Sequence, residues 1–533
     1  MWPEQFAWFH PNKLECSFEV GTKTGGRLLK SSLDLVIVSP GNNRVIYQDL
    51  SREYAAVEPP VWAGLLASFS RKKGYQVAII DQEAQGLEPE IIAEQCIEYQ
   101  PKLVAVVVYG QQPSASTQNM TMAASICSEI KKLDPELKTV MVGGHPSALP
   151  ERTLNESEAD FVCQGEGPAT LEGLLQVENL EDESLYSRVP GLWYRAGGFP
   201  AFTHPSPVIA QNDLANVLPG VAWDLLPMDV YRAHNWHCFT HIDQREPYAA
   251  LYTSLGCPFR CSFCCINAPF GKPALRCWDP EFVITELDLL ATKYQVKNIK
   301  IVDEMFVLNP SHVIRLCDLI IERGYDFNFW AYARVDTVKD HFLEKLKKAG
   351  FNWLVLGIES GSKHVRDGVD KGRFQEEDIY TIVKKIQEAG IYVLGNYIFG
   401  LPDEDFASMQ ATLDMSVELN CEWANFYCGM AYPGSQLYND ALEKEWVLPA
   451  QWHDFSQHSF EMLPLPSQHV PAEEIIAFRD MAWQMYFKNP RYVDAIRDKF
   501  GQAVVDHLTA LTEIKLPRKY AKPPGVPPHL IAA

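Results

Sequence analysis

The sequence predicts an α/β protein in which a doubly wound parallel sheet precedes a partial (βα)6 barrel and a helical C-terminal region. Two observations predict this fold. Short apolar strands alternate with helical patterns in two separate series, and polar residues gather where the strands end. A chain of 533 residues is also too long for one domain.

The composition is that of an ordinary globular protein and excludes several partners. Hydrophobic residues make up 47% of the chain, and the formal net charge is −21 with no basic run, so we expect no nucleic-acid partner. The N-terminus has neither the basic nor the apolar region of a signal peptide, and the longest apolar runs have strand length, which predicts no membrane span and a cytoplasmic location. In that reducing compartment the thirteen cysteines are expected to be thiols or metal ligands, not disulfides.

The first series forms the predicted domain 33–175, which follows an N-terminal extension, 1–32. Helical patterns such as 59–74 and 90–100 separate its strands, as a parallel sheet with crossover helices requires. The predicted strands are 34–40, 76–81, 103–110, 139–144 and 159–166. Residues 176–246 are less periodic and rich in prolines and aromatics, so they are predicted to be a linker.

The second series forms the predicted barrel domain 247–445. Its polar residues lie at the carboxyl ends of the strands, where barrel enzymes place their chemistry. The predicted strands are 248–256, 298–304, 327–336, 353–360, 392–400 and 423–431. The remaining residues, 446–533, are predicted to be helical around 471–515 and to end in a proline-rich tail.

The loop after the first barrel strand carries Cys257, Cys261 and Cys264 in the pattern C-x3-C-x2-C. Three thiolates can hold three irons of a [4Fe-4S] cluster and leave the fourth iron open for a substrate. The alternatives are a zinc site or plain buried thiols. Zinc would need a fourth ligand, for which Cys265 is badly placed and Cys277 is distant.

This segment resembles the signature of radical S-adenosylmethionine (radical SAM) enzymes, with Phe263 in the aromatic slot before the third cysteine. The resemblance implies that the open iron chelates S-adenosylmethionine inside a TIM-like barrel. It also implies that Asp303 and Glu304 accept hydrogen bonds from the methionine amino group and that Arg334 meets its carboxylate. The ribose and adenine contacts that it implies are Glu359, Ser360 and Asn396. The alternative for each residue is a polar group that only satisfies the barrel rim.

The first domain resembles the Rossmann-like cobalamin-binding domain that precedes the barrel in one subgroup of this family. The resemblance rests on three loops, each of which follows a strand: 109–117, 143–151 and 164–167. The cobalamin-binding residues that it implies are Tyr109, Gln111, Ser114, Ser116, Gly143, Gly144, His145, Gly165, Glu166 and Gly167. The alternative is a generic nucleotide site, but neither G-x-G-x-x-G nor G-x4-G-K-[ST] occurs in these loops.

The chain departs from the pattern of many cobalamin proteins in one respect. Their D-x-H-x-x-G motif supplies a histidine ligand to cobalt, and no D-x-H occurs in this sequence. His145 lies in a loop that the family packs against the corrin ring. We therefore expect no histidine ligand to cobalt.

The resemblance implies a cobalamin-dependent radical SAM methyltransferase. Such an enzyme moves a methyl group from S-adenosylmethionine through methylcobalamin to an unactivated carbon, or phosphorus, of a small-molecule substrate, and takes electrons from an external donor such as flavodoxin or ferredoxin. One alternative is an oxidoreductase or cyclase of the same family without methyl transfer, and another is a non-catalytic cobalamin carrier. The substrate itself is not predicted. Tyr231, Trp236, His237, Cys238, Tyr427 and Tyr432 are candidates for its pocket, although packing of one domain against the other is the more usual role of such buried aromatics.

Overall fold

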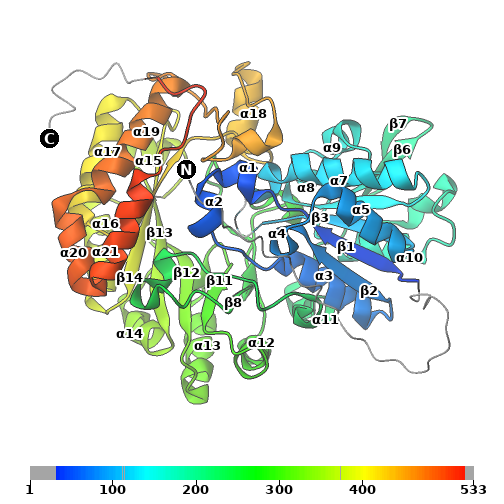
Figure 1. Ribbon diagram of the computed structural model, residues 1–533, viewed down its shortest axis with the longest axis horizontal. Coiled ribbons are helices and arrows are strands. Elements are labelled where there is room, and N and C mark those ends of the chain that lie inside the picture. The colour runs from blue at the N-terminus through cyan, green and yellow to red at the C-terminus, as the bar shows by residue number, and fades with distance from the viewer. Residues whose placement is uncertain (1–31, 111, 113, 373, 523–533) are drawn as a thin grey trace, which may run out of the picture.

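The computed structural model describes residues 32–522, apart from 111, 113 and 373. Most of the predicted N-terminal extension and the predicted cobalamin-binding residue Gln111 therefore lie outside the described residues. The chain forms an N-terminal sheet domain and a C-terminal barrel domain that lie side by side (Figure 1). No helix in the described part of the chain is both long and apolar enough to span a membrane.

The first domain is built on a seven-stranded sheet with the order β2-β1-β3-β4-β5-β6-β7. Its strands are β1 (Leu35–Ser39), β2 (Val77–Asp81), β3 (Leu103–Val108), β4 (Thr139–Gly143), β5 (Phe161–Cys163), β6 (Leu192–Ala196) and β7 (Phe199–Phe202). The first five are parallel and match the five predicted strands, whereas β6 and β7 are antiparallel. The hairpin of β6 and β7 falls within 176–246, so this part of the predicted linker belongs to the first sheet.

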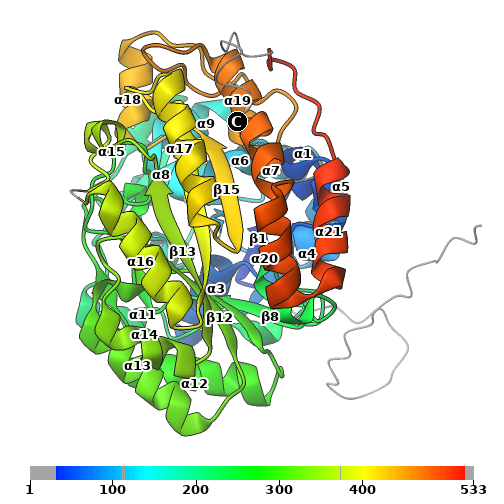
Figure 2. The same ribbon diagram turned by 90° about the vertical axis from the view of Figure 1, so that its left-hand side faces the viewer.

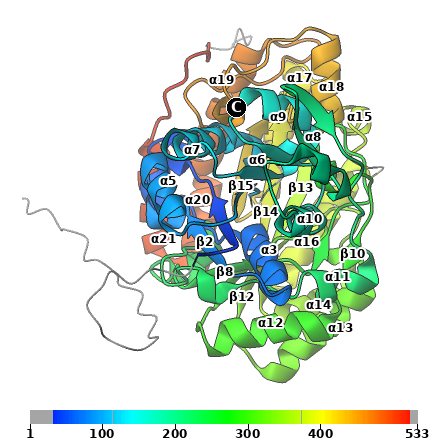
Figure 3. The same ribbon diagram turned by 90° about the vertical axis from the view of Figure 1, so that its right-hand side faces the viewer.

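Helices cover both faces of this sheet, as a doubly wound fold requires. The side chains of β1 alternate: Leu35 and Ile37 pack in the core under α3 and α10, and Val36 and Val38 pack in a separate core under α5 and α7. Figure 3 shows these helices from the outer side of the domain. The helices are α1 (Asn43–Tyr47), α2 (Leu50–Glu53), α3 (Val61–Lys72), α4 (Gln82–Gln85), α5 (Pro89–Glu98), α6 (Ala115–Gln118), α7 (Met120–Leu133), α8 (Gly144–Ala148), α9 (Pro150–Glu156), α10 (Pro168–Gln176) and α11 (Leu214–Val217).

The second domain is an open barrel of six parallel strands in the order β8-β11-β12-β13-β14-β15. The strands are β8 (Tyr248–Leu251), β11 (Asn298–Ile301), β12 (Asn328–Arg334), β13 (Phe351–Glu359), β14 (Tyr392–Phe399) and β15 (Trp423–Cys428). They coincide with the six predicted strands. β8 and β15 do not pair with each other, so the barrel has an open side between them.

Helices follow the barrel strands and form its outer layer. They are α12 (Pro280–Thr292), α13 (Pro310–Arg323), α14 (Asp340–Lys348), α15 (Lys363–Gly368), α16 (Glu376–Glu388), α17 (Phe406–Leu419) and α18 (Gln436–Glu443). A two-stranded antiparallel sheet of β9 (Ser254–Leu255) and β10 (Arg276–Cys277) brackets the cysteine loop. The cysteine loop thus begins after β9 and ends before β10, and these two strands pair with each other.

Three C-terminal helices cover the barrel beside β15: α19 (Ala472–Phe487), α20 (Pro490–Phe500) and α21 (Gln502–Glu513). Figure 2 shows them next to this edge strand. Arg479 Nε donates to the carbonyl of Phe426 at 2.7 Å, and the Tyr486 hydroxyl donates to the carbonyl of Cys421 at 2.5 Å. An edge strand with unpaired backbone groups invites aggregation, and these side-chain donors satisfy part of that edge.

A short helix, η4 (Trp236–His241), closes the amino-terminal end of the barrel. His237 donates from Nε2 to the carbonyl of Asn328, the first residue of β12, at 2.8 Å. The Trp236 ring lies 5.2 Å from the rings of both Trp330 and Trp353. The barrel interior is therefore open to ligands mainly from its carboxyl-terminal end and its open side.

Candidate functional site

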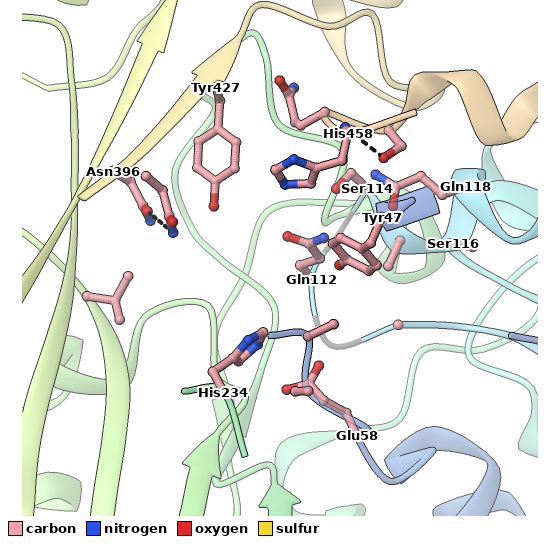
Figure 4. Close-up of a pocket in the computed structure, with 18 of the residues that line it drawn as sticks. Tyr47, Glu58, Gln112, Ser114, Ser116, Gln118, His234, Asn396, Tyr427 and His458 are labelled. Carbon is pink, nitrogen blue, oxygen red and sulfur yellow. Dashed lines mark hydrogen bonds between the residues drawn. The ribbon is translucent and has the colours of Figure 1, made fainter. Parts of the chain in front are cut away.

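A cavity of about 920 Å³ lies between the two domains. The segments that follow β1 and β3 line one side of it, and the carboxyl-terminal halves of the barrel strands line the other. In the first sheet, β1 and β3 are the strands between which the connections reverse direction, the usual ligand site of such sheets. Both domains thus present their ligand-binding edges to one space (Figure 4).

The three predicted cluster ligands, Cys257, Cys261 and Cys264, all line this cavity. A glycine precedes the first of them because Gly256 has a φ of +80°, and a Cβ there would lie 2.6 Å from the carbonyl oxygen of Ala274. Burial raises the pKa of the Cys257 thiol to about 11, so the free thiol is protonated until a metal binds and displaces the proton.

Glu304 is the strongest candidate for an amino-group acceptor at the same end of the cavity. Its Oε2 atom is buried and has no hydrogen-bond partner among the residues that the structure describes, and burial raises the pKa of the carboxyl group to about 8. A buried acceptor without a partner is costly in the protein alone. A ligand ammonium group would satisfy it.

Arg334 crosses from the barrel wall to the cysteine loop. Its Nη1 donates to Cys261 Sγ at 3.4 Å, and its guanidinium centre lies 3.8 Å from the centroid of the Phe259 ring. Asp336 holds the other side of the guanidinium at 3.0 Å. The predicted carboxylate-binding arginine is therefore fixed beside a predicted cluster ligand.

Three more predicted residues, Phe263, Glu359 and Asn396, line the cavity. Glu359 has a left-handed backbone with φ +67°, and its carboxylate forms a buried ion pair with Lys371, which also lies 5.9 Å from the Phe263 ring. Asn396 accepts a hydrogen bond from Asn425 at 3.1 Å. Lys371 was not predicted, and nothing in its sequence context singles it out.

Two predicted barrel residues do not line the cavity. Asp303 is buried and accepts hydrogen bonds from the backbone N–H of Thr253 at 2.6 Å and from the Ser254 hydroxyl at 2.7 Å. Ser360 is also buried, and its hydroxyl bonds Glu404 at 3.3 Å and Thr412 at 3.1 Å. In this structure both hold neighbouring elements together.

On the first-domain side, Tyr109, Ser114, Ser116 and Gly144 line the cavity. The Tyr109 ring stacks on Trp62 with a centroid distance of 4.6 Å, and its buried hydroxyl has no partner in the part of the chain that the structure describes. The Ser116 hydroxyl donates to the carbonyl of Val108 and accepts from the backbone N–H of His145 at 2.9 Å. Ser116 thus joins the loop after β3 to the loop after β4.

The other predicted cobalamin residues sit behind the cavity wall. Gly143 allows close packing of β4 on β3, since a Cβ there would lie 2.1 Å from the carbonyl oxygen of Val108. His145 is buried against Thr117, with a ring-nitrogen to hydroxyl distance of 3.2 Å, and burial lowers its pKa to about 3. Gly165 and Gly167 have positive φ values, and Glu166 between them forms a buried ion pair with Arg276 at 2.7 Å.

The candidate residues for a substrate pocket also fall into two groups, one that lines the cavity and one that does not. Trp236, Tyr427 and Tyr432 line the cavity, whereas Tyr231, His237 and Cys238 are buried in packing contacts. The sequence reasoning missed Tyr47, Glu58, Lys300 and Tyr332, which also line the cavity. The alternation of side chains along a strand could have identified Lys300 and Tyr332. Lys300 lies an even number of residues before Glu304 in the predicted strand 298–304, and Tyr332 an even number before Arg334 in the predicted strand 327–336.

The residues present fit the three cofactors that the sequence predicts. No three His, Cys, Asp or Glu side chains within the described ranges are grouped to hold a single metal ion. An iron–sulfur cluster does not need its ligands around one metal ion, because each cysteine binds a different iron. Three thiols from one loop can therefore hold it. The orphaned Oε2 of Glu304 fits the amino group of S-adenosylmethionine, and the cavity between the domains offers the room and the unpartnered Tyr109 hydroxyl that a corrin would need.

Comparisons with known proteins match a different family model to each of the two domains that line the cavity. A B12-binding domain model matches residues 47–175, and a radical SAM superfamily model matches residues 251–416. An uncharacterized methyltransferase of Pyrococcus horikoshii is 29% identical over 85% of this chain and 92% of its own length. An anaerobic magnesium-protoporphyrin IX monomethyl ester cyclase of Rubrivivax gelatinosus is 26% identical over 78% of this chain and 71% of its own length.

Among solved structures, the radical S-adenosylmethionine methyltransferase TsrM of Kitasatospora setae, with cobalamin and a [4Fe-4S] cluster bound, superposes with a TM-score of 0.60. The match covers 78% of each chain at 18% identity, which shows a shared fold. The two domain models follow each other in the order that the two sheets have in the structure. The chain therefore belongs to the radical SAM superfamily, and a B12-binding domain precedes its radical SAM domain.

Proposed function

We propose that this protein is a methyltransferase that uses S-adenosylmethionine and cobalamin to methylate an unactivated carbon, or a phosphorus, of a small molecule. One observation carries the proposal: candidate residues from both cofactor sets, Glu304 and Arg334 from one and Tyr109 and Ser114 from the other, line a single cavity. Methyl transfer between the two cofactors and a substrate needs such a shared space, whereas a cobalamin carrier does not. Several relatives of the chain are named as methyltransferases, which supports the same function.

When bound, the cluster supplies the electron that cleaves S-adenosylmethionine, and cobalamin supplies the atom that carries the methyl group. Cys257, Cys261 and Cys264 would hold the cluster. Glu304 would accept from the amino group of S-adenosylmethionine, and Arg334 would donate to its carboxylate, the charge-assisted contacts that orient a zwitterion best. Tyr109, Ser114 and Gly144 would contact the corrin from the first domain.

Aromatic residues form two apolar parts of the cavity wall. Trp62 stacks on Tyr109 at the domain junction, and Trp236 closes the barrel floor against Trp330. A dry site protects a reactive radical from side reactions. We further propose that the electron comes from an external one-electron donor such as flavodoxin or ferredoxin and that no nucleic acid takes part, in keeping with the net charge of −21.

The decisive experiment follows the fate of S-adenosylmethionine labelled on its methyl group. Anaerobically reconstituted holoenzyme, given its reductant and a substrate-containing extract from its source cells, should form S-adenosylhomocysteine and 5′-deoxyadenosine in a ratio near one to one. The label should appear in a new small-molecule product. The Arg334→Ala variant should lose 5′-deoxyadenosine formation, because it lacks the contact that orients the carboxylate.

Two outcomes would contradict the proposal. Absence of S-adenosylhomocysteine would exclude methyl transfer. Formation of 5′-deoxyadenosine alone, with a product that keeps the carbon count of its substrate, would show an oxidising or ring-forming enzyme instead.

A further inference from the structure

Part of the cavity lies inside the barrel, away from the cofactor residues. We call it the chamber and define it by Tyr47, His234, Lys300, Trp330, Tyr332 and Tyr427, all of which line the cavity. On the barrel strands, Tyr332 pairs with Val355 one layer below the pair of Arg334 and Gly357, and Trp330 with Lys300 forms the layer beneath. The chamber therefore begins where the predicted S-adenosylmethionine contacts end.

Three tyrosine hydroxyl groups face the chamber from three different elements. Tyr47 comes from α1, Tyr332 from β12 and Tyr427 from β15, and Figure 4 shows Tyr47 and Tyr427 on opposite sides of the space. None of the three hydroxyls forms a hydrogen bond with another described residue. Burial raises the pKa of all three, and the pKa of Tyr332 is raised further by Tyr427 and Tyr47. The chamber thus holds neutral phenols that have no hydrogen-bond partner among the described residues.

The charged groups of the chamber are already paired. Lys300 forms an ion pair with Glu58 of the first domain at 3.1 Å, and the Tyr248 hydroxyl donates to the same carboxylate at 2.9 Å. The Lys300 side chain is 3% exposed, and its ammonium lies 4.8 Å from the centroid of the Trp330 ring. Burial lowers the pKa of His234 to about 3, so its imidazole is neutral.

The remaining surface of the chamber is aromatic and aliphatic. Trp330 and the rings of the three tyrosines provide flat apolar area, and Val355 and Leu394 line the cavity in the same layer as Tyr332. An anion placed here would lose its hydration, and the described cation of the chamber is held by Glu58. A neutral molecule would lose little and would supply partners to the phenols.

We propose that the chamber is the substrate site and that it takes an uncharged, largely apolar substrate with a flat ring system, held through its hydroxyl or carbonyl oxygens by Tyr332, Tyr427 and Tyr47. It discriminates against phosphate monoesters and carboxylate derivatives of the same ring, because both are anions. This inference rests on the proposed function only in naming the ligand as the substrate. The chemistry of the chamber stands on its own residues.

A matched pair of probes tests the inference without turnover. Equilibrium dialysis against holoenzyme loaded with S-adenosylmethionine, without reductant, should show that 2-naphthol binds at least about ten-fold more tightly than 2-naphthyl phosphate. The Tyr332→Phe/Tyr427→Phe variant should bind 2-naphthol about ten-fold more weakly, because it lacks two hydrogen-bonding groups, and should bind naphthalene as the wild type does. Cobalamin content and circular dichroism would confirm that the variant is folded.

The control is Tyr325→Phe, whose hydroxyl donates to Asp288 outside the cavity at 2.8 Å and which should bind both probes like the wild type. Equal or tighter binding of the phosphate would overturn the inference, as would 2-naphthol binding that is absent or that does not change in the double variant. The two proposals fail separately. A protein that prefers 2-naphthol but forms no S-adenosylhomocysteine refutes methyl transfer alone, and a methyltransferase that prefers the phosphate refutes the chamber alone.

Discussion

Glu304 is a carboxylic acid that burial keeps mostly protonated at neutral pH, with a pKa of about 8. It accepts best from an ammonium group when it is ionised, so binding of that group must release the carboxyl proton whenever the pH is below this pKa. The affinity for S-adenosylmethionine should therefore rise with pH below 8 and level off near it.

We predict that the affinity of cluster-loaded protein for S-adenosylmethionine increases by about 25-fold between pH 6.0 and 7.5, close to the slope of one proton released per ligand bound. Equilibrium dialysis at a series of pH values measures this. Glu304→Gln should bind more weakly and with little dependence on pH. An unchanged slope in that variant would show that another group releases the proton.

The same residue shows what the sequence can and cannot predict at this scale. Asp303 and Glu304 were both predicted as acceptors for the amino group, because the resemblance to radical SAM enzymes assigns that role to the acidic strand end in which both stand. Neighbouring residues on an extended chain point to opposite sides, and only Glu304 lines the cavity, while Asp303 bonds Thr253 and Ser254 behind it. A sequence motif predicts where along the chain a functional residue lies, but the fold determines which way its side chain points.

Among the elements, the cysteine loop makes the sharpest prediction because two adjacent cysteines have different surroundings. Cys265 is buried, and its Cβ would lie 3.7 Å from a Cβ added to Gly434, in the segment after β15. Cys264 is more exposed and has the spacing of the third predicted ligand. One thiol therefore packs against a neighbouring segment, and the other is available to iron.

We predict that Cys265→Ala protein, reconstituted anaerobically, still binds about four irons per chain. Cys264→Ala protein should lose this cluster, since two thiolates remain from the loop. Iron and sulfide analysis with electron paramagnetic resonance measures both variants. Loss of the cluster in Cys265→Ala with retention in Cys264→Ala would reverse the ligand assignment.

The sequence predicted the parallel strands of the first sheet well and its antiparallel strands poorly. β3 and β4 consist of buried apolar residues, a pattern typical of parallel strands covered on both faces. β6 and β7 are short and only partly buried, and they carry polar and aromatic residues without clear alternation. Their pairing with β5 depends on a long-range contact, so 176–246 was predicted as linker.

At the scale of the whole molecule, buried ion pairs join the two domains. Glu166 lies in the first domain and Arg276 in β10 of the barrel domain, with an N–O distance of 2.7 Å and side chains 3% and 9% exposed. Arg276 also donates to the carbonyl of Ile209 at 2.7 Å. Removal of one partner leaves an uncompensated buried charge.

We predict that Arg276→Met lowers the free energy of unfolding by about 3–5 kcal/mol. Adding Glu166→Gln should restore part of this loss, because the double variant buries no unpaired charge. Thermal unfolding followed by circular dichroism measures the cycle. Additive losses in the two single variants would show that the pair does not couple the domains.

The position of the two domains relative to each other was beyond prediction from local patterns. Glu166 was expected to contact cobalamin because it stands in a glycine-rich loop after a strand. Its partner, Arg276, lies 110 residues away. Helix and strand periodicity carries no information on such a contact, and only the folded chain shows it.

The first domain contributes to the proposed substrate chamber, whereas the predicted cluster and S-adenosylmethionine contacts do not depend on it. The predicted cluster and S-adenosylmethionine contacts sit on the barrel domain, whereas Tyr47 and Glu58 reach the chamber from the short helices and loops after β1. Changes in that segment would alter which molecule fits while the reactive machinery stays intact. Related enzymes could in this way acquire new substrates through substitutions in this segment. Exchange of residues 43–58 would be the corresponding route for engineering the substrate range.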